Sequence, residues 1–276
     1  MRNAWSLFRL RLHWNGFARR NARWAILTRQ DRRPVNAPPW SREEFLRTGS
    51  EEVANVLERL RQEGIPFPQG RALDFGCGVG RLTFALGEHF LEAIGVDVSE
   101  QMIALATADN PRPGVCRFIH NARPDLPCAD ASVDFVYSRF VLQHMSRSLA
   151  RAYIAEFLRV LTPDGLCVFQ LPEPEDDSIR GSALKRALPL PLVRVFRRLR
   201  VAWRQGPQFP RMEMVGVARE DVRVWLREAG ASFIETWQDN SHGTQSPGYV
   251  YVARRARNST GAAIHVASLD PSDWIS

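Results

Sequence analysis

Apolar residues in the middle of the chain follow two different rhythms in turn. Between residues 71 and 170, short runs of consecutive apolar residues alternate with longer segments in which apolar residues recur every three or four positions. The first rhythm is typical of buried strands and the second of helices that cover a sheet. Their alternation predicts an α/β fold in which a parallel sheet is covered by helices on both faces.

The flanking segments add a helix before this region and a hairpin after it. Ser41 and Glu44 match a capping box, which predicts a helix that ends near Gly64. Towards the other end, a helix-like run leads to strand-like runs at 232–238 and 248–254. Two adjacent strands joined by a turn predict an antiparallel hairpin at the edge of the sheet.

One turn in the predicted sheet is rich in glycine. A strand-like run contains Asp74, glycines stand at Gly76, Gly78 and Gly80, and a helix-like run follows. Glycine lets the backbone turn tightly and lets a ligand approach without a Cβ in the way. Backbone N–H groups at a turn that opens a helix also point at whatever lies there. A dinucleotide fingerprint would need its third glycine one place later, where Arg81 stands, so we expect a different ligand.

A second acid lies at the end of the next strand-like run. Residues 93–97 read as a buried strand that ends in Asp97, 23 residues after Asp74. This spacing is close to that of the acid that holds a ribose in doubly wound folds. An ionised carboxylate accepts hydrogen bonds from both hydroxyls of a vicinal diol. The glycine turn and Asp97 therefore predict a nucleoside site at one edge of the sheet.

Together these segments resemble class I S-adenosylmethionine-dependent methyltransferases. The G-x-G-x-G turn, with an acid two residues ahead of it, is similar to the first motif of that family, and matching segments follow in order from about residue 68 to 254. The resemblance implies a Rossmann-like, doubly wound, seven-stranded sheet, mostly parallel with an antiparallel final hairpin. It also implies S-adenosyl-L-methionine as the cofactor and S-adenosyl-L-homocysteine as the product.

The resemblance further implies roles for individual residues. Asp97 would bind the ribose, and Asp74 would orient the turn or meet the amino group, directly or through water. Asn121 replaces the acid that the family usually has beside the adenine, and its carbonyl oxygen would accept from the adenine amino group. Ser138 and Arg139 would face the methionine end and the acceptor. The expected cofactor-binding residues are Asp74, Phe75, Gly76, Cys77, Gly78, Gly80, Asp97, Val98, Met102, Asn121, Ala122, Ser138 and Arg139.

A catalytic base is harder to assign. Methyl transfer from a sulfonium mainly needs positioning and only sometimes a base. His144 follows the fourth predicted strand and is the best-placed catalytic candidate. A histidine that only closes a helix turn would give the same sequence pattern. His242 is an alternative, and Asp176 and Asp177 could contact a polar acceptor. Cys128 follows a proline, as the nucleophile of cytosine-C5 methyltransferases does, but the resemblance places it in a turn where we expect packing.

Composition bounds the class of protein. A length of 276 residues with 45% hydrophobic residues suits one α/β domain with additions. No apolar run is long enough to span a bilayer, and arginines interrupt the first apolar residues, so no signal peptide is expected. The four cysteines show no C-x-x-C spacing, which favours reduced, buried thiols in a cytoplasmic protein over a disulfide frame or a metal site.

The net charge of +7 is unevenly spread along the chain. Residues 1–40 contain nine arginines and one acid, and a predicted helix at 192–204 has arginines around an apolar stripe. Either segment could make peripheral contact with an anionic membrane, or its arginines could simply be solvated. No RNA-binding module accompanies them, so no nucleic-acid partner is expected. The sequence does not fix the oligomeric state.

These observations predict five segments. A basic helical extension, rich in Trp and Arg and acting as a lid, occupies 1–67, and the cofactor-binding core occupies 68–171. A helical insertion at 172–217 would cover the acceptor, residues 218–254 would complete the sheet, and 255–276 would form a tail. The two lid segments would exclude water from the reaction.

We therefore expect an enzyme that methylates a small molecule or a carrier-linked metabolite, such as a sugar, lipid or natural-product intermediate, at oxygen by the usual preference of the family. The missing Asn-Pro-Pro-aromatic motif counts against nucleobases and protein glutamine as acceptors. Two alternatives stay open. One is an RNA methyltransferase that uses the arginine-rich appendages, and the other is a cofactor-binding regulatory or partner subunit without chemistry.

Overall fold

The computed structural model of this chain describes residues 2–27, 40–174, 214–239 and 248–256. Within them, seven strands form one sheet in the order β3-β2-β1-β4-β5-β7-β6. The pairs from β3 to β5 are parallel, whereas β7 runs antiparallel to both β5 and β6. The predicted seven-stranded, mostly parallel sheet is therefore confirmed. The strands are β1 (Arg71–Phe75), β2 (Glu92–Asp97), β3 (Cys116–His120), β4 (Val133–Ser138), β5 (Leu161–Pro172), β6 (Ala231–Asp239) and β7 (Gly248–Arg255).

Serine caps begin three of the helices, in agreement with their sequence signals. Ser41 Oγ accepts from Glu44 N at the start of α2, and the Glu44 side chain returns to the Ser41 backbone. Ser99 and Ser146 cap α4 and α5 in the same manner. The described helices are α1 (Arg2–Ile26), α2 (Arg42–Gln62), α3 (Arg81–Leu86), α4 (Glu100–Ala108), α5 (Arg147–Val160) and α8 (Arg219–Glu228), with a 3-10 turn η2 (Leu142–His144).

The segment after β4 forms a short turn before the next helix begins. Leu142–His144 form only the 3-10 turn η2, because Met145 adopts an extended conformation with φ −107° and ψ 158°. Helix α5 then begins afresh after its own cap, Ser146. The short turn places the side chains of Gln143 and His144 at the carboxyl edge of the sheet rather than on a regular helix face.

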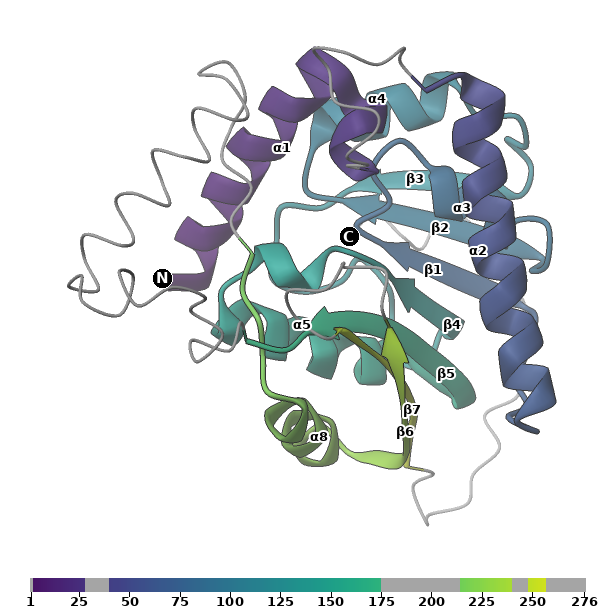
Figure 1. Cartoon of the computed structure of the whole chain (residues 1–276), viewed down its shortest axis with the longest axis vertical. Helices are drawn as coiled ribbons and strands as arrows, with labels where there is room; N and C mark the ends of the chain where they lie inside the picture. The colour runs from purple at the N-terminus through teal and green to yellow at the C-terminus, as the bar shows by residue number, and fades with distance from the viewer. Residues whose placement is uncertain (1, 28–39, 175–213, 240–247, 257–276) are drawn as a thin grey trace, which may run out of the picture.

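Side chains of the central strands alternate between two cores, one on each face of the sheet. Leu73 and Phe75 of β1 pack with the buried residues of α5 and α8. Ala72, which comes directly before Leu73 in the sequence, packs with the core formed by α2 and α3. This period-two alternation is what a strand buried on both faces requires. The predicted covering of both faces by helices is thus confirmed, and Figure 1 shows α2 crossing one side of the sheet.

Helix α1 lies away from both of these layers, over the carboxyl ends of the strands (Figure 1). It packs mainly on α4, where Asn15 is buried between the two helices. Its regular path breaks at Asn21, which has φ −161° and ψ 87°. The Asn21 side chain accepts a hydrogen bond from Trp24 N, which restarts the helix in a new direction. The break lets Ile26 reach back towards the glycine turn.

Several predicted features lie outside the described residues. They are the helix at 192–204, most of the 172–217 insertion with Asp176 and Asp177, the turn that contains His242, and the tail beyond 256. The five segment boundaries stay predictions. All four cysteines are buried free thiols, as expected. Among the described helices, none combines the length and the apolar character needed to cross a bilayer.

Candidate functional site

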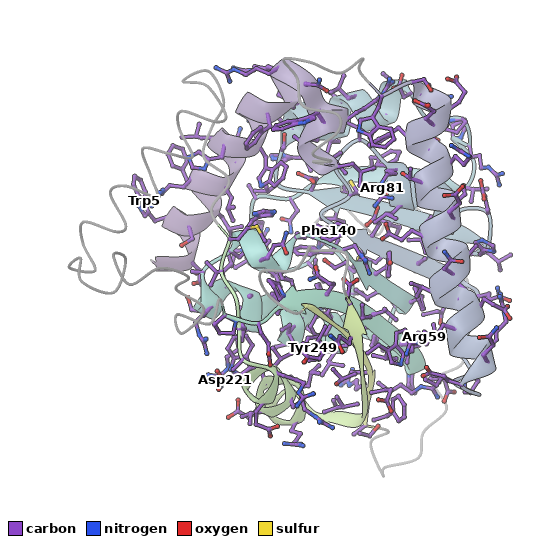
Figure 2. The ribbon with its side chains drawn as sticks, in the orientation of Figure 1. Trp5, Arg59, Arg81, Phe140, Asp221 and Tyr249 are labelled. Carbon is purple, nitrogen blue, oxygen red and sulfur yellow. The ribbon has the colours of Figure 1, made fainter. Side chains whose placement is uncertain are left out.

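The carboxyl ends of β1, β2 and β4 open into a cavity of about 320 Å³. Strand ends and the glycine turn form one wall, and Leu7, Leu10 and Trp14 of α1 form the opposite wall. Figure 2 labels Arg81 and Phe140, which line this cavity between α1 and α2. Ligands of open α/β sheets bind at the carboxyl edge where the strand order changes direction. In this sheet the change lies between β1 and β4, because β2 and β3 follow β1 on one side and β4 and β5 lie on the other.

Two features of the turn require glycine: its backbone has positive φ angles, and neighbouring side chains leave no room for a Cβ. Gly76 and Gly78 have φ of +78° and +53°, in the left-handed region. A Cβ on Gly76 would lie 2.3 Å from the Val141 side chain, and one on Gly78 would lie 2.5 Å from that of Ile26. Gly76 N donates to Val96 O over 2.7 Å, which ties the turn to β2. Helix α1 and the turn therefore leave no room for a side chain at Gly78.

Asp97 is held at the end of β2 with its carboxylate in the cavity wall. Gly78 N donates to Oδ2 over 2.9 Å, and Ser99 N donates to Oδ1 over 2.7 Å. Burial raises the pKa of Asp97 above its usual value, and these two N–H donors oppose that rise. Each carboxylate oxygen retains a second lone pair, so the group can still accept from both hydroxyls of a diol.

Asp74 lies beneath the turn rather than in the cavity wall. Its side chain is buried, and Oδ2 accepts from Thr83 Oγ1 over 2.7 Å. Oδ1 is buried with no hydrogen-bond partner among the described residues. Burial raises the pKa of Asp74 to about 7, while the Thr83 hydrogen bond and the Arg81 charge lower it. This position favours the first of its two expected roles, that of orienting the turn.

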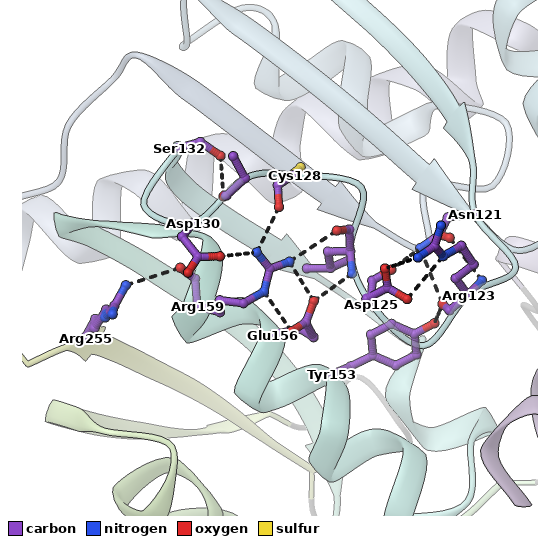
Figure 3. Close-up of polar contacts among 12 residues, drawn as sticks. Asn121, Arg123, Asp125, Cys128, Asp130, Ser132, Tyr153, Glu156, Arg159 and Arg255 are labelled. Atoms are coloured by element: carbon purple, nitrogen blue, oxygen red, sulfur yellow. Dashed lines mark hydrogen bonds and ion pairs between the residues drawn. The ribbon is translucent and has the colours of Figure 1, made fainter. Parts of the chain in front are cut away.

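Asn121 follows β3 at the cavity wall, in a loop that α5 holds in place (Figure 3). Its Nδ2 donates to Asp125 O over 2.7 Å, and Arg123 N donates to its Oδ1 over 3.0 Å. The Tyr153 hydroxyl donates to Arg123 O over 2.8 Å, and the Arg159 guanidinium donates to further loop carbonyls. The Asn121 carbonyl oxygen thus makes one local bond and keeps one lone pair for a ligand.

The other predicted residues divide into two groups. Cavity-lining residues from the predicted set are Phe75, Gly76, Cys77, Gly78, Asp97, Val98, Asn121, Arg139 and the base candidate His144. Asp74, Gly80, Met102, Ala122 and Ser138 do not line it. Met102 is buried in a cluster with residues of α1 and α2, and Ser138 Oγ donates to Phe75 O over 3.0 Å. These residues support the wall instead of forming it.

Cys128 belongs to the core on the α5 side and does not line the cavity. Burial raises the pKa of its thiol to about 11. A nucleophilic cysteine needs a thiolate near neutral pH, so the packing role expected for Cys128 agrees with its surroundings.

A network of buried charges forms one end of the cavity, and sequence analysis did not find it. Glu52 of α2 accepts from Arg81 over 2.9 Å and from the Tyr137 hydroxyl over 3.1 Å. Arg139 forms ion pairs with Glu52 at 3.4 Å and with Asp239 of β6 at 3.2 Å. Burial works against the charge of Arg139, but Tyr137, Glu52 and Asp239 raise its pKa above the usual value. Arg81 and Arg139 both line the cavity as fixed cations.

His144 lies on the side of the cavity that α1 covers. Its ring meets Trp14 edge-on, with centroids 5.4 Å apart. Its Nε2 is 3.4 Å from Gln143 Nε2, and since a side-chain amide nitrogen can only donate, His144 Nε2 is the acceptor in this contact. The sequence pattern predicts His144 at this site but carries no signal for its contact with α1.

Phe140 also lines the cavity, and its backbone conformation is strained. Its φ of +59° is rare for a bulky residue. Its backbone N–H donates to Oε1 of buried Gln170 over 3.3 Å. Backbone strain of this kind persists only where neighbours hold it, and it is frequent at ligand sites.

The residues present fit S-adenosylmethionine. The turn of left-handed glycines brings its backbone to the cavity, and Asp97 beside it offers acceptors for a ribose diol. Arg81 and Arg139 offer cations for the carboxylate of the amino-acid part. Asn121 and Val98 line the side where the base would lie. Nothing in this donor set selects a pyrophosphate, which would call for the dinucleotide spacing of glycines.

Comparison with known proteins agrees with this geometry. Residues 73–169 match the family described as methyltransferase domain. The chain is 33% identical over 166 residues to 24-methylenesterol C-methyltransferase 2 of Oryza sativa subsp. japonica, which covers 55% of this chain and 43% of the relative. It is 36% identical over 116 residues to malonyl-[acyl-carrier protein] O-methyltransferase of Hahella chejuensis, covering 41% of this chain and 39% of the relative.

The fold also matches solved structures. Magnesium protoporphyrin IX methyltransferase from Synechocystis PCC 6803 with bound SAH superposes with a TM-score of 0.55 at 20% identity, over 90% of this chain and 98% of the other. The matches to the two curated relatives span less than half of each relative's length. The family match covers residues 73–169, which include β2 to β4 and most of β1 and β5.

Proposed function

Because this chain contains a class I S-adenosylmethionine-dependent methyltransferase domain, we propose that it is an enzyme that transfers a methyl group to a hydroxyl of a small-molecule or carrier-linked metabolite. One observation carries the proposal: the nucleoside site at Asp97 and the imidazole of His144 line the same cavity, which α1 covers. A binding subunit without chemistry would not need a base candidate there.

Several residues of the cavity wall would have defined roles in such a reaction. Asp97 would hold the ribose, and Arg139 would hold the carboxylate of the methionine part. Leu7, Leu10 and Trp14 of α1 would exclude water from the acceptor. When bound, the cofactor would supply a sulfonium-activated methyl group; attack of an acceptor oxygen on the methyl carbon would expel the thioether sulfur in line.

His144 would remove the proton that the acceptor loses. A hydroxyl becomes an ether or ester when its oxygen bonds to the methyl carbon, so its proton must pass to a base. His144 lines the cavity, and its Nε2 could receive this proton once the acceptor replaces the Gln143 amide as its partner. After transfer the imidazolium would release the proton to solvent.

The lining favours an acceptor that is mostly apolar. Val141, Met145 and Met214 add to the apolar residues of α1 around His144. Small-molecule and carrier-linked acceptors also appear in the names of relatives, such as the methylenesterol and malonyl-[acyl-carrier protein] methyltransferases. A sterol-like, quinone-like or acyl-type acceptor with one reacting hydroxyl or carboxyl suits both observations.

The test is transfer of labelled methyl groups from the cofactor into fractionated cell extract. We expect label in the small-molecule or lipid fraction, loss of labelling with Asp97→Ala, and a strong reduction with His144→Gln. Label in RNA alone would overturn the choice of acceptor class. Saturable cofactor binding without labelling of any fraction would support a non-catalytic subunit instead.

A further inference from the structure

Helix α1 is apolar on two faces, and the described core uses only one of them. Leu7 and Phe17 on the inner face are buried. Trp5, Phe8 and Leu12 occupy a stripe at helical spacing on the opposite face and are 64%, 48% and 55% exposed. We call this stripe the outer face of α1. Figure 2 shows Trp5 on the side of the helix that points away from the sheet.

The outer face is a continuous feature rather than three scattered residues. The Trp5 and Phe8 rings stack with centroids 5.6 Å apart and an interplanar angle of 23°. Exposed large apolar residues that adjoin one another mark interaction surfaces, whereas single ones do not. Tryptophan and phenylalanine are also the residues that enter the boundary between lipid headgroups and acyl chains.

Positive charge surrounds this stripe. Arg9, Arg19 and Arg20 of α1 are exposed. The first 40 residues contain nine arginines against the single acid Asp31. An apolar stripe flanked by arginines is complementary to a surface that is negatively charged outside and apolar beneath.

We propose that the outer face of α1 docks on an anionic lipid bilayer, with Trp5, Phe8 and Leu12 inserted and the neighbouring arginines against the headgroups. A second copy of this chain fits less well, because a symmetric contact would bring the same arginines together. Nucleic acid would use the arginines but leave three large apolar side chains in water.

Docking through the outer face of α1 would place the bilayer near a second cavity that leads to His144. This cavity of about 260 Å³ extends from Trp5 and Arg9 along α1 to His144. It shares Leu10, Trp14, His144 and Met145 with the cofactor cavity. A docked bilayer would therefore lie at the entrance of a path to the reaction centre. This consequence rests on the proposed methyltransferase function, whereas docking itself does not.

The experiment is co-sedimentation of the full chain with vesicles of phosphatidylcholine alone or with added phosphatidylglycerol. We expect binding to the anionic vesicles only, and weakening by increasing salt. Replacing the stripe (Trp5→Ser, Phe8→Ser, Leu12→Ser) should weaken binding at least tenfold. Replacing the charges (Arg9→Gln, Arg19→Gln, Arg20→Gln) should weaken it roughly a hundredfold, at about fivefold for each arginine.

Matched variants elsewhere control for the loss of any exposed side chain. Leu91→Ser removes an apolar residue that is 83% exposed outside α1, and Arg47→Gln removes an exposed arginine of α2. Both should bind vesicles as the unchanged chain does. Calorimetric binding of S-adenosylmethionine by the stripe variant shows whether its fold is retained, so a failure of docking is separable from a failure of the proposed function.

Three results would overturn the proposal. The first is equal sedimentation of the stripe variant and the unchanged chain, or no sedimentation of either with anionic vesicles. The second is a concentration-dependent dimer in light scattering that the stripe variant abolishes, which would assign this face to a second copy. Cross-linking of position 8 to residues 175–213 without lipid would assign it to this chain's own insertion and would count equally against the bilayer.

Discussion

Asn15 of α1 and Ser99, the N-cap of α4, are joined by a hydrogen bond of 2.6 Å from Ser99 Oγ to Asn15 Oδ1, and both side chains are buried. Ser99 N also donates to the carboxylate of Asp97. Helix α1 is thus attached two residues from the acid that we expect to hold the ribose. Ser99 therefore contacts both α1 and the expected nucleoside site.

Asn15→Ala should loosen the lid. The substitution leaves a buried hydroxyl without its acceptor, which costs about 1–3 kcal/mol. We expect faster amide hydrogen exchange in α1 and faster release of the cofactor in stopped-flow measurements. Asn3→Ala is the matched control, because Asn3 makes an exposed hydrogen bond to Ser148 from the same helix. Equal exchange in both variants would contradict the proposed fastening.

Gly78→Ala should weaken cofactor binding at least tenfold. Its positive φ and the approach of Ile26 within 2.5 Å of a built Cβ together force the turn or the lid to move. Gly64→Ala isolates the backbone part of this effect, because Gly64 has φ +66° but nothing within 4 Å of its built Cβ. The control should lose about 1 kcal/mol of stability and keep its cofactor affinity, both measurable by urea unfolding and calorimetry.

Asp74 should make stability fall as the pH rises. Its pKa is about 7 in the folded protein against an ordinary value of 3.8, since burial disfavours the charged form. Between these values the folded state keeps a proton that the unfolded chain has lost, so the stabilisation is complete below pH 4 and is lost as the pH rises through 7. Asp97 has a shift in the same direction.

Asp74→Asn removes this ionisation and leaves Thr83 an acceptor. At 1.36 kcal/mol per pKa unit, the unchanged chain should lose about 3 kcal/mol more than the variant between pH 5 and pH 8. Urea titrations of both proteins at several pH values measure the difference directly. Parallel pH profiles would mean that Asp74 is ionised throughout.

His144→Gln should reduce kcat by about 10²- to 10⁴-fold, the usual contribution of a general base. Cofactor affinity should stay unchanged, because His144 is placed on the acceptor side. His89→Gln, outside the cavity lining, serves as control. An unchanged kcat in the His144 variant would assign this histidine to packing against Trp14.

The sheet and its glycine turn could be predicted because their signals are local. Asp97 ends a short apolar strand, and Gly76 and Gly78 carry backbone requirements that few other residues meet. Ser41 marks the start of its helix through a capping box that spans only Ser41 to Glu44. In each case the residues that decide the structure are neighbours in the sequence.

The remainder of the site depends on contacts between distant residues. Arg139 lines the cavity between Glu52 and Asp239, which come from α2 and β6, and no sequence pattern links the three. Helix α1 has apolar residues on both faces, so its periodicity could not tell which face covers the cavity. Asn121 was expected to face the adenine, but its side chain also closes a local turn through Arg123 N, a contact typical of asparagine in any loop.

Isothermal calorimetry with S-adenosylmethionine tests the central claim most directly. The unchanged chain should bind one equivalent saturably, and Asp97→Ala should weaken binding at least tenfold, since a hydrogen bond to a charged group contributes about 1.5–3 kcal/mol. Asp130→Ala, an exposed acid outside the cavity lining, should bind normally. Absence of saturable binding, or equal affinity in the Asp97 variant, would contradict the assignment of this cavity to a nucleoside sulfonium.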